Sequence, residues 1–315
     1  MDYNYLGNTG IKVSRLCFGS LTIGPLQANL SIDEGARVIR CALDLGVNFI
    51  DTAQLYSNYE YIRRGLMGWP GDIVIATKSY DYTREGMGKS LESALKSLSR
   101  DYIDIFLLHE QESELTIKGH WEAVEELIRA REKGTVKALG ISTHSVPGVR
   151  AAAAVPEIDV IHPIINIRGI GIRDGSAEEM RAAILDAAAA GKGLYGMKAL
   201  GGGNLINEKK EAFDYVLSVP GLSSVAVGMQ TPDEVLYNVA VFEGREIPPD
   251  TERAVSQKNR RLHIEDWCTG CGRCVQICGP GALTVVEGRA VADTGLCRLC
   301  GYCSTVCEDM CIKII

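Results

Sequence analysis

Short apolar runs alternate with longer amphipathic stretches over the first 242 residues of the chain. Each run is six to eight residues long and rich in β-branched or other apolar side chains, which is typical of buried strands. The stretches between the runs repeat their apolar residues at helical spacing. The pattern predicts eight strands, at 13–19, 48–53, 72–78, 102–109, 138–143, 160–166, 193–200 and 224–229.

Helix signals occupy the intervals between these runs. Ser31 followed by Glu34 has the spacing of a capping box, which predicts a helix start at Ser31. A second helix is predicted from Trp121 to Lys133, with Gly134 ending it. Two more helices are predicted at 177–190 and 232–242.

Eight strands that each precede a helix predict a parallel sheet with helical crossovers, and eight strands are enough to close a (β/α)8 TIM barrel. The continuous apolar character of the strands agrees with a sheet covered by helices. The alternative is an open, doubly wound sheet, which needs a glycine-rich phosphate loop after its first strand. The segment found there, GSLTIGPL, does not fit that loop, so the fold class predicted is the barrel.

The distribution of cysteines along the chain indicates a domain boundary. Nine of the 11 lie in the last 48 residues, whereas Cys17 and Cys41 sit in apolar surroundings and are interpreted as small buried hydrophobes. We therefore expect a barrel at 1–242, a charged linker with a helix starting near Asp250 at 243–267, and a small cysteine-rich domain at 268–315.

Charge and hydropathy exclude two classes of partner. A formal charge of −7 without any basic run argues against nucleic acid. No apolar stretch reaches the roughly 18 residues that span a bilayer, and the first residues do not form a signal segment. We expect a cytoplasmic protein.

The tail repeats the spacing C-x2-C-x2-C-x3-C, first from Cys268 and again from Cys297. This is the spacing that holds [4Fe–4S] clusters, because three thiolates on a tight loop face one cubane while the fourth can reach the other. Disulfides are disfavoured by a reducing compartment, and zinc sites end at four ligands. Two clusters are predicted.

The tail resembles a two-cluster bacterial-type ferredoxin over residues 268–315, including an apolar hairpin that turns at Glu287-Gly288. Aligning its two halves places Cys311 opposite Ala282, which indicates a packed thiol rather than a ligand. The resemblance implies one cluster on Cys268, Cys271, Cys274 and Cys307, and the other on Cys297, Cys300, Cys303 and Cys278.

Polar residues end three predicted barrel strands, where barrel enzymes place their catalytic groups. These residues are Asp51, Lys78 and His109, and Tyr56 follows five residues after Asp51. A lysine beside a tyrosine would lower the tyrosine pKa, and an aspartate would hold the lysine charged. The alternatives are a structural salt bridge, a core histidine and a surface tyrosine.

Residues 1–242 resemble the aldo-keto reductases. The resemblance rests on YLGNTGIKVSRLCFG, GVNFIDTAQLY, ATK, DIFLLHE and GIST. Asp51, Tyr56, Lys78 and His109 fill all four positions of the family's catalytic tetrad. The resemblance implies reversible hydride transfer between a nicotinamide and a small carbonyl or alcohol, with Tyr56 as the general acid and His109 steering the substrate.

The same resemblance implies a nicotinamide site whose residues depart from the family pattern. Glu234 occupies a position where many relatives carry an arginine for the 2′-phosphate, so a carboxylate there favours NAD(H) over NADP(H). The implied cofactor contacts are Ser142, Thr143, His162, Met197, Gly228, Glu234 and Asn238.

Three functions stay open for the combined chain. The clusters could exchange electrons with a partner protein on behalf of a carbonyl reductase. They could instead brace the fold or sense redox state beside a nicotinamide-dependent reductase. The barrel could also bind a ligand without turnover, or catalyse a reaction that needs no nicotinamide. The tail has four acidic and four basic residues from Cys268 onward, and this neutrality predicts a module packed against its own barrel.

Overall fold

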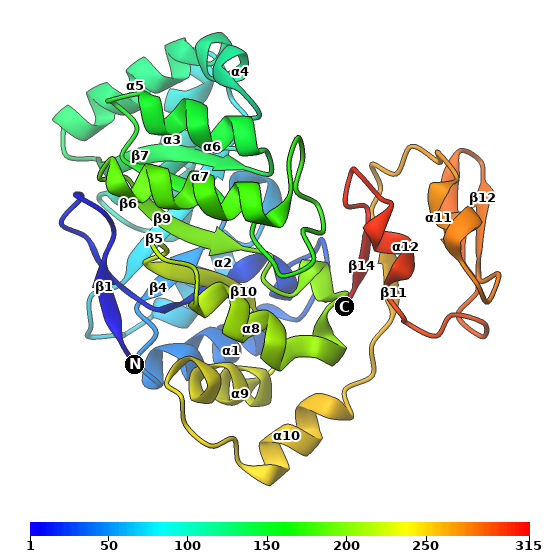
Figure 1. The fold of residues 1–315 in the computed structure, drawn as a ribbon. Helices are drawn as coiled ribbons and strands as arrows, with labels where there is room; N and C mark the ends of the chain where they lie inside the picture. The colour runs from blue at the N-terminus through cyan, green and yellow to red at the C-terminus, as the bar shows by residue number, and fades with distance from the viewer.

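The computed structural model describes residues 1–315 and contains a closed barrel of parallel strands (Figure 1). The first and last barrel strands, β3 and β10, pair through Val225 and Leu16 and close the ring. This confirms the predicted barrel. Its strands are β3 (Leu16–Gly19), β4 (Phe49–Asp51), β5 (Val74–Ser79), β6 (Ile103–Leu108), β7 (Val136–Thr143), β8 (Val160–Pro163), β9 (Gly193–Met197) and β10 (Ser224–Gly228).

The predicted first strand is divided in two. β1 (Tyr3–Tyr5) and β2 (Lys12–Ser14) form an antiparallel hairpin outside the barrel, and β3 starts after Arg15. Leu6 and Val13 of this hairpin are fully buried and join the apolar cluster inside the barrel. The hairpin therefore plugs the N-terminal end, and the prediction of one continuous strand at 13–19 is wrong.

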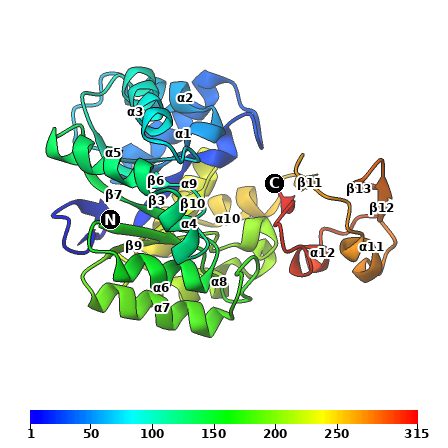
Figure 2. The same cartoon turned by 90° about the horizontal axis from the view of Figure 1, so that it is seen from above.

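Helices surround the barrel (Figure 2). The predicted capping box is present, since Ser31 Oγ accepts a hydrogen bond from Glu34 N at 3.3 Å and Glu34 Oε2 accepts one from Ser31 N at 3.0 Å. The helices are α1 (Ile32–Asp44), α2 (Tyr59–Leu66), α3 (Arg84–Leu98), α4 (Glu114–Gly119), α5 (Trp121–Glu132), α6 (Val146–Ala154), α7 (Ala177–Ala189), α8 (Lys209–Leu217) and α9 (Pro232–Phe242). Short 3-10 turns are η1 (Ser20–Ile23), η2 (Gln54–Tyr56), η3 (Gly201–Gly203) and η4 (Ile206–Glu208).

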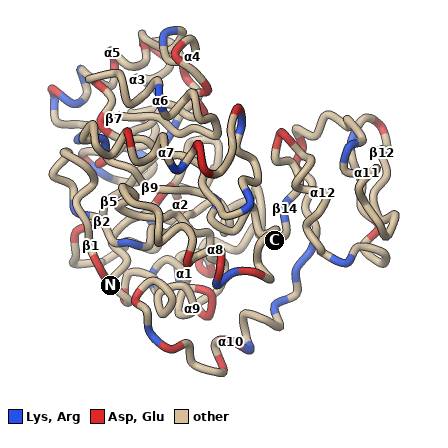
Figure 3. Tube along the Cα trace, in the orientation of Figure 1, with Lys and Arg blue, Asp and Glu red and all other residues tan.

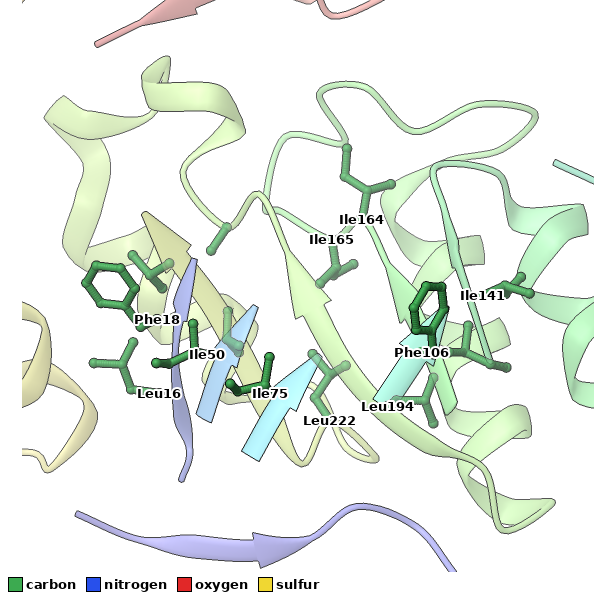
Figure 4. Close-up of a cluster of buried hydrophobic side chains, with 14 of the residues drawn as sticks. Leu16, Phe18, Ile50, Ile75, Phe106, Ile141, Ile164, Ile165, Leu194 and Leu222 are labelled. Atoms are coloured by element: carbon green, nitrogen blue, oxygen red, sulfur yellow. The ribbon is translucent and has the colours of Figure 1, made fainter. Parts of the chain in front are cut away.

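The strands bury both faces. Alternate residues such as Phe49, Leu107 and Tyr195 fill the barrel interior, while their neighbours Ile50 and Phe106 belong to the large cluster that includes the helices (Figure 4). Period-two alternation along each strand produces these two layers. The same alternation determines which residue at the end of each strand points into the barrel.

The cysteine-rich tail lies beside the C-terminal face of the barrel (Figure 1). The hairpin of β12 and β13 turns at Glu287-Gly288, as predicted. β11 pairs with β14, which brings the start of the tail beside the chain end. The elements are α10 (Pro249–Ser256), β11 (Leu262–Ile264), α11 (Arg273–Ile277), β12 (Leu283–Val286), β13 (Arg289–Ala292), α12 (Tyr302–Thr305) and β14 (Ile312–Ile314).

The tail packs directly on the barrel, which confirms the expectation drawn from its neutral charge. Met310 is buried within the barrel's apolar cluster, and Asn204 Nδ2 donates to Ile312 O at 3.4 Å. Gly203 has φ +87°, and an added Cβ would lie 1.9 Å from Ile314 O. None of the helices has the length and apolarity needed to cross a membrane.

Candidate active site

Inward-facing positions at the C-terminal ends of the barrel strands carry the predicted site residues. Each lies two positions after a residue of the barrel interior, as Asp51 follows Phe49 and His109 follows Leu107. Because alternate residues share a face, these side chains continue the interior stack upward to the rim. The residues so placed are Asp51, Lys78, His109, Ser142, His162, Met197 and Gly228.

Asp51 is the centre of a buried polar cluster. Its Oδ2 lies 2.8 Å from Lys78 Nζ, which also donates to Thr52 O at 2.7 Å. Its Oδ1 accepts from Tyr195 Oη at 2.9 Å and lies 3.6 Å from His162 Nε2. The carboxylate is thus shared between the lysine and a tyrosine that sequence reasoning did not single out.

Tyr56 lies at the end of η2, on a loop held by buried Asn58. Asn58 Nδ2 donates to Ser20 O at 2.8 Å, and Thr52 Oγ1 donates to Asn58 Oδ1 at 2.7 Å. Lys78 Nζ lies 5.0 Å from the centre of the Tyr56 ring. The structure therefore brings the predicted donor and the lysine together.

The protonation of Tyr56 differs from the expectation. Burial, reinforced by Asp51 and Glu110, raises the pKa of Tyr56 well above 10. Lys78 does not reverse this effect, because its ammonium is already paired with Asp51 and Thr52 O. The expected lowering is wrong, and Tyr56 is a neutral phenol at physiological pH.

His109 completes the tetrad as a neutral imidazole. Burial, followed by the charge on Lys78, lowers its pKa well below 6.5. Its ring stacks on Tyr80 at a centroid distance of 4.3 Å and lies 5.9 Å from the Tyr56 ring. Its Nδ1 is buried without a hydrogen-bond partner, so the histidine retains capacity to bind a polar group.

A long groove starts at Asp51 and Tyr56 and crosses the barrel face. We call it the central groove. It passes His162, Met197 and Gly228 and reaches Glu234 and Asn238 on α9, and Ile314 and Ile315 of the tail form part of its wall. Five basic side chains line it but only two acidic ones, in a chain whose net charge is −7. The basic residues are Lys198, Lys209, Lys258, Arg260 and Lys313, and the acidic ones are Asp51 and Glu234.

Two of the predicted nicotinamide contacts have their hydroxyls engaged by backbone amides. Ser142 Oγ accepts from Glu110 N at 2.9 Å, and Thr143 Oγ1 accepts from Ser145 N at 3.0 Å. Neither residue lines the central groove. His162 does line it, and its ring stacks on Tyr195 at 3.8 Å while Nδ1 lies 2.6 Å from Tyr195 O.

Glu234 is not the free carboxylate that the preference for NAD(H) assumed. Its Oε1 accepts from Lys258 Nζ at 2.8 Å and from Arg260 Nη2 at 3.2 Å. Both cations come from the linker, far along the chain. Two positive charges accompany its one negative charge, which weakens the argument that Glu234 would repel a phosphate. The preference for NAD(H) stays a prediction.

Lys198 is a further residue of the groove lining, next to Met197 in the chain. It adopts φ +59° at the end of β9, and its Nζ lies 3.1 Å from His144 Nε2 and 3.5 Å from Met310 Sδ. Burial, with Lys313 nearby, lowers the pKa of Lys198 to about 7. The residue thus links the barrel rim to the tail.

The cysteines separate into two cavities in the tail. One is lined by Cys268, Cys271, Cys274 and Cys307, together with Cys311, and the other by Cys278, Cys297, Cys300 and Cys303. These are the two sets expected for the two clusters. Nowhere in residues 1–315 do three cysteine, histidine or carboxylate side chains converge closely enough to hold a single metal ion. Eight thiols around two cavities fit polynuclear clusters better than zinc.

Backbone amides support the fourth cysteine of each set in the same way. Ala282 N donates to Cys278 Sγ at 3.2 Å, and Cys311 N donates to Cys307 Sγ at 3.3 Å. This equivalence confirms that Cys311 stands opposite Ala282. Hydrogen bonds to the sulfurs are one of the means by which proteins tune cluster potentials.

Comparison with known proteins decides the family. A profile described as "Aldo/keto reductase family" matches residues 15–214, which is more than half of the chain. The chain belongs to the aldo/keto reductase family. A second profile, "4Fe-4S binding domain", matches residues 262–284 of the tail.

Similar proteins in the family include one named as a channel subunit and one named as a dehydrogenase. The chain is 30% identical over 182 residues to a probable voltage-gated potassium channel subunit beta from Arabidopsis thaliana, covering 52% of this chain and 54% of that one. It is 29% identical over 154 residues to L-galactose dehydrogenase from the same plant, covering 45% and 48%. The matches span about half the length of these curated relatives.

A solved structure covers more of the reductase barrel. A putative aldo-keto reductase from Pseudomonas aeruginosa is 28% identical, with a TM-score of 0.66, and the match covers 77% of this chain and 94% of that one. The contacts of Lys258 and Arg260 with Glu234 come from residues beyond the family match at 15–214.

Proposed function

We propose that the chain is an oxidoreductase that reversibly reduces a small aldehyde or ketone with a nicotinamide cofactor bound in the central groove. The observation that carries this proposal is the convergence of Asp51, Tyr56, Lys78 and His109, of which Asp51 and Tyr56 line that groove. Lys78 Nζ lies 2.8 Å from Asp51 Oδ2 and 5.0 Å from the Tyr56 ring centre, and Tyr56 lines the groove. Family membership supports the same chemistry.

The groove suits a dinucleotide. Its basic lining complements phosphates, and α9 presents its N-terminal end, capped by Thr231, beside Glu234 and Asn238. His162 and Met197 would border the nicotinamide end, near the tetrad. The reduced nicotinamide, when bound, supplies the hydride.

Tyr56 is proposed as the general acid. The phenol is protonated at neutral pH and can donate its proton to the carbonyl oxygen as charge develops there, but its raised pKa makes it a weaker acid, so donation depends on stabilising the phenolate. Lys78, held by Asp51, places a positive charge near the ring and stabilises the phenolate left behind. His109, neutral and with Nδ1 free of a partner, would orient the substrate oxygen.

Eight cysteine thiols would hold two [4Fe–4S] clusters that exchange electrons with a partner protein. The set containing Cys307 is closer along the chain to the groove, since Met310 follows it into the barrel core and Lys313 to Ile315 line the groove. The clusters would pass single electrons, whereas the carbonyl reaction uses a pair. This tail position supports communication between the two centres.

Two measurements test the proposal. Replacing Tyr56 with Phe should abolish carbonyl reduction while nucleotide binding, followed by fluorescence, is retained; unchanged turnover would reject Tyr56 as the acid. Anaerobic titration of the iron-loaded protein with NADH and NADPH should bleach the visible cluster absorbance if the centres are coupled. If the wild type bleaches and a Lys78 variant does not, reduction of the clusters depends on the tetrad.

A second candidate is a barrel that binds the nucleotide without turnover and reports its state to a partner. The similarity to a potassium channel subunit beta favours it, as does the engagement of the Ser142 and Thr143 hydroxyls by backbone amides away from the central groove. Tight nucleotide binding with no reduction of any of a panel of small aldehydes and ketones would support this candidate over the enzyme.

A further inference from the structure

Two basic residues of the linker enter the central groove. Lys258 and Arg260 lie between α10 and β11, where basic residues follow one another along the chain (Figure 3). Lys258 Nζ donates to Gln230 Oε1 at 2.6 Å as well as to Glu234 Oε1 at 2.8 Å. Both basic residues line the groove together with Gln230, Glu234 and Asn238.

This cluster is largely buried and carries a surplus positive charge. The side chains of Lys258, Arg260 and Glu234 are 18%, 14% and 11% exposed. Two cations face one carboxylate, so the cluster carries one unpaired positive charge. Because the cluster is largely buried, solvent and salt screen this charge less than they would a charge on the surface. Burial lowers the pKa of Lys258, while the Glu234 carboxylate acts to keep the lysine charged.

The unpaired positive charge of Lys258 and Arg260 lies at the α9 end of the groove, away from Tyr56. A dinucleotide whose reactive ring lies beside the tetrad would extend its adenosine toward this end. Nucleotide-binding sites distinguish the two nicotinamide cofactors at the adenosine ribose, where a carboxylate accepts a bond from a 2′-hydroxyl and a basic side chain accommodates a 2′-phosphate. A carboxylate that already accepts hydrogen bonds from two cations is not free to accept one from a 2′-hydroxyl.

We propose that Lys258 and Arg260 form a binding site for the 2′-phosphate of NADP(H), so that the linker, rather than the barrel, determines cofactor specificity. This inference rests on the proposed nicotinamide function. The phosphate would compensate the surplus charge and accept hydrogen bonds from both side chains. Glu234 would hold the two cations in place while no nucleotide is bound.

The site also ties nucleotide binding to the iron–sulfur tail. β11 begins two residues after Arg260 and pairs with β14, and Arg261 N donates to Ile315 O at 2.9 Å. Ile314 and Ile315 line the same groove. A phosphate bound by the linker would therefore hold the tail strands against the barrel.

The test compares dissociation constants of NADPH and NADH for the intact, iron-loaded protein by fluorescence titration. We expect the wild type to bind NADPH at least about tenfold more tightly, and Lys258→Gln or Arg260→Gln each to weaken NADPH binding about tenfold, because one charge-assisted bond is lost. NADH binding should change less than about twofold. Glu234→Gln, which removes the competing anion, should tighten NADPH binding.

Arg253→Gln is the matched control, since Arg253 belongs to the same linker, lies outside the groove and is 64% exposed. Its NADPH/NADH ratio should equal that of the wild type. Equal affinity of the wild type for both nucleotides, or an equal loss of both in the two groove variants, overturns the phosphate site and leaves the proposed function standing. Failure to bind either nucleotide overturns both.

Discussion

Lys78 and Asp51 form an ion pair of 2.8 Å at the rim of the barrel, and their side chains are only 1% and 7% exposed. The partners come from adjacent strands, β5 and β4, whose register pairs Asp51 with Ala76. A pair so deeply buried costs much desolvation, which its geometry and the bond to Thr52 O offset. The pair lies beside Tyr56, the proposed general acid.

Breaking this pair from one side should be severe. Lys78→Met leaves the Asp51 carboxylate buried and uncompensated, and we expect the free energy of unfolding of the barrel to fall by about 3 to 5 kcal/mol. Turnover should fall by about 100-fold or more, because the phenolate of Tyr56 loses its nearby cation. Chemical unfolding followed by circular dichroism checks the first effect and steady-state assays the second. If the double variant Asp51→Asn/Lys78→Met is no more stable than Lys78→Met, the unpaired charge is not the cause.

Lys198 should give the protein a pH-dependent stability. Its pKa is lowered by burial to about 7, whereas a lysine in the unfolded chain titrates near 10.4. Between these values the unfolded state binds more protons, so this group makes stability rise with pH from about 7 to about 10, by up to roughly 1.4 kcal/mol per pH unit. Below about pH 7 both states are protonated and the contribution is constant.

Unfolding measured at several pH values in wild type and Lys198→Met checks this slope. The variant should lack it, because methionine does not titrate. Lys210→Met serves as the control, since Lys210 is 76% exposed in a surface pair with Asp214. The same slope in wild type and Lys198→Met would show that the lysine retains an ordinary pKa.

The two sets of cysteines should behave independently as ligands. Cys307→Ser and Cys303→Ser should each reduce bound iron from about eight to about four atoms per chain, because each removes a thiolate from a different cluster. Cys311→Ala should retain about eight, since Cys311 provides a backbone N–H to Cys307 and its side chain is packed. Iron analysis and electron paramagnetic resonance of the reduced protein provide the readout. Loss of iron in Cys311→Ala would identify this cysteine as a ligand.

Docking of the tail should depend on Gly203. A Cβ at this position would lie 1.9 Å from Ile314 O, so Gly203→Ala should displace β14 from the barrel. We expect faster hydrogen exchange at 312–315 and faster proteolysis of the linker. Gly244→Ala is the control, because Gly244 also has positive φ, +62°, but has no atom within 4 Å of an added Cβ. Equal protection in both variants would mean that β14 does not depend on this contact.

Local sequence patterns were sufficient to predict the positions of many of the candidate site residues. The positions of Asp51, Lys78 and His109 at the barrel rim could be predicted because alternation along a strand and the end of an apolar run are both visible in the sequence. Their assignment with Tyr56 as a catalytic tetrad rests on the resemblance to the aldo-keto reductases and stays a prediction. The cysteine sets could be predicted for a similar reason, since ligand geometry on a tight loop is encoded by spacing. The spacing within each cysteine loop is local, but the assignment of Cys307 to the set of Cys268, Cys271 and Cys274 came from the resemblance to ferredoxins.

Contacts between distant parts of the chain were decided only by the tertiary structure. Tyr195 meets Asp51 across 144 residues, and Lys258 and Arg260 neutralise Glu234 from a linker whose sequence does not specify where it passes. The pKa of Tyr56 likewise depends on how far the fold desolvates its ring and on the nearby Asp51 and Glu110 carboxylates. Sequence periodicity determines which residues share a face, but charge compensation depends on which residues the completed fold brings within a few ångströms, as it does at Glu234.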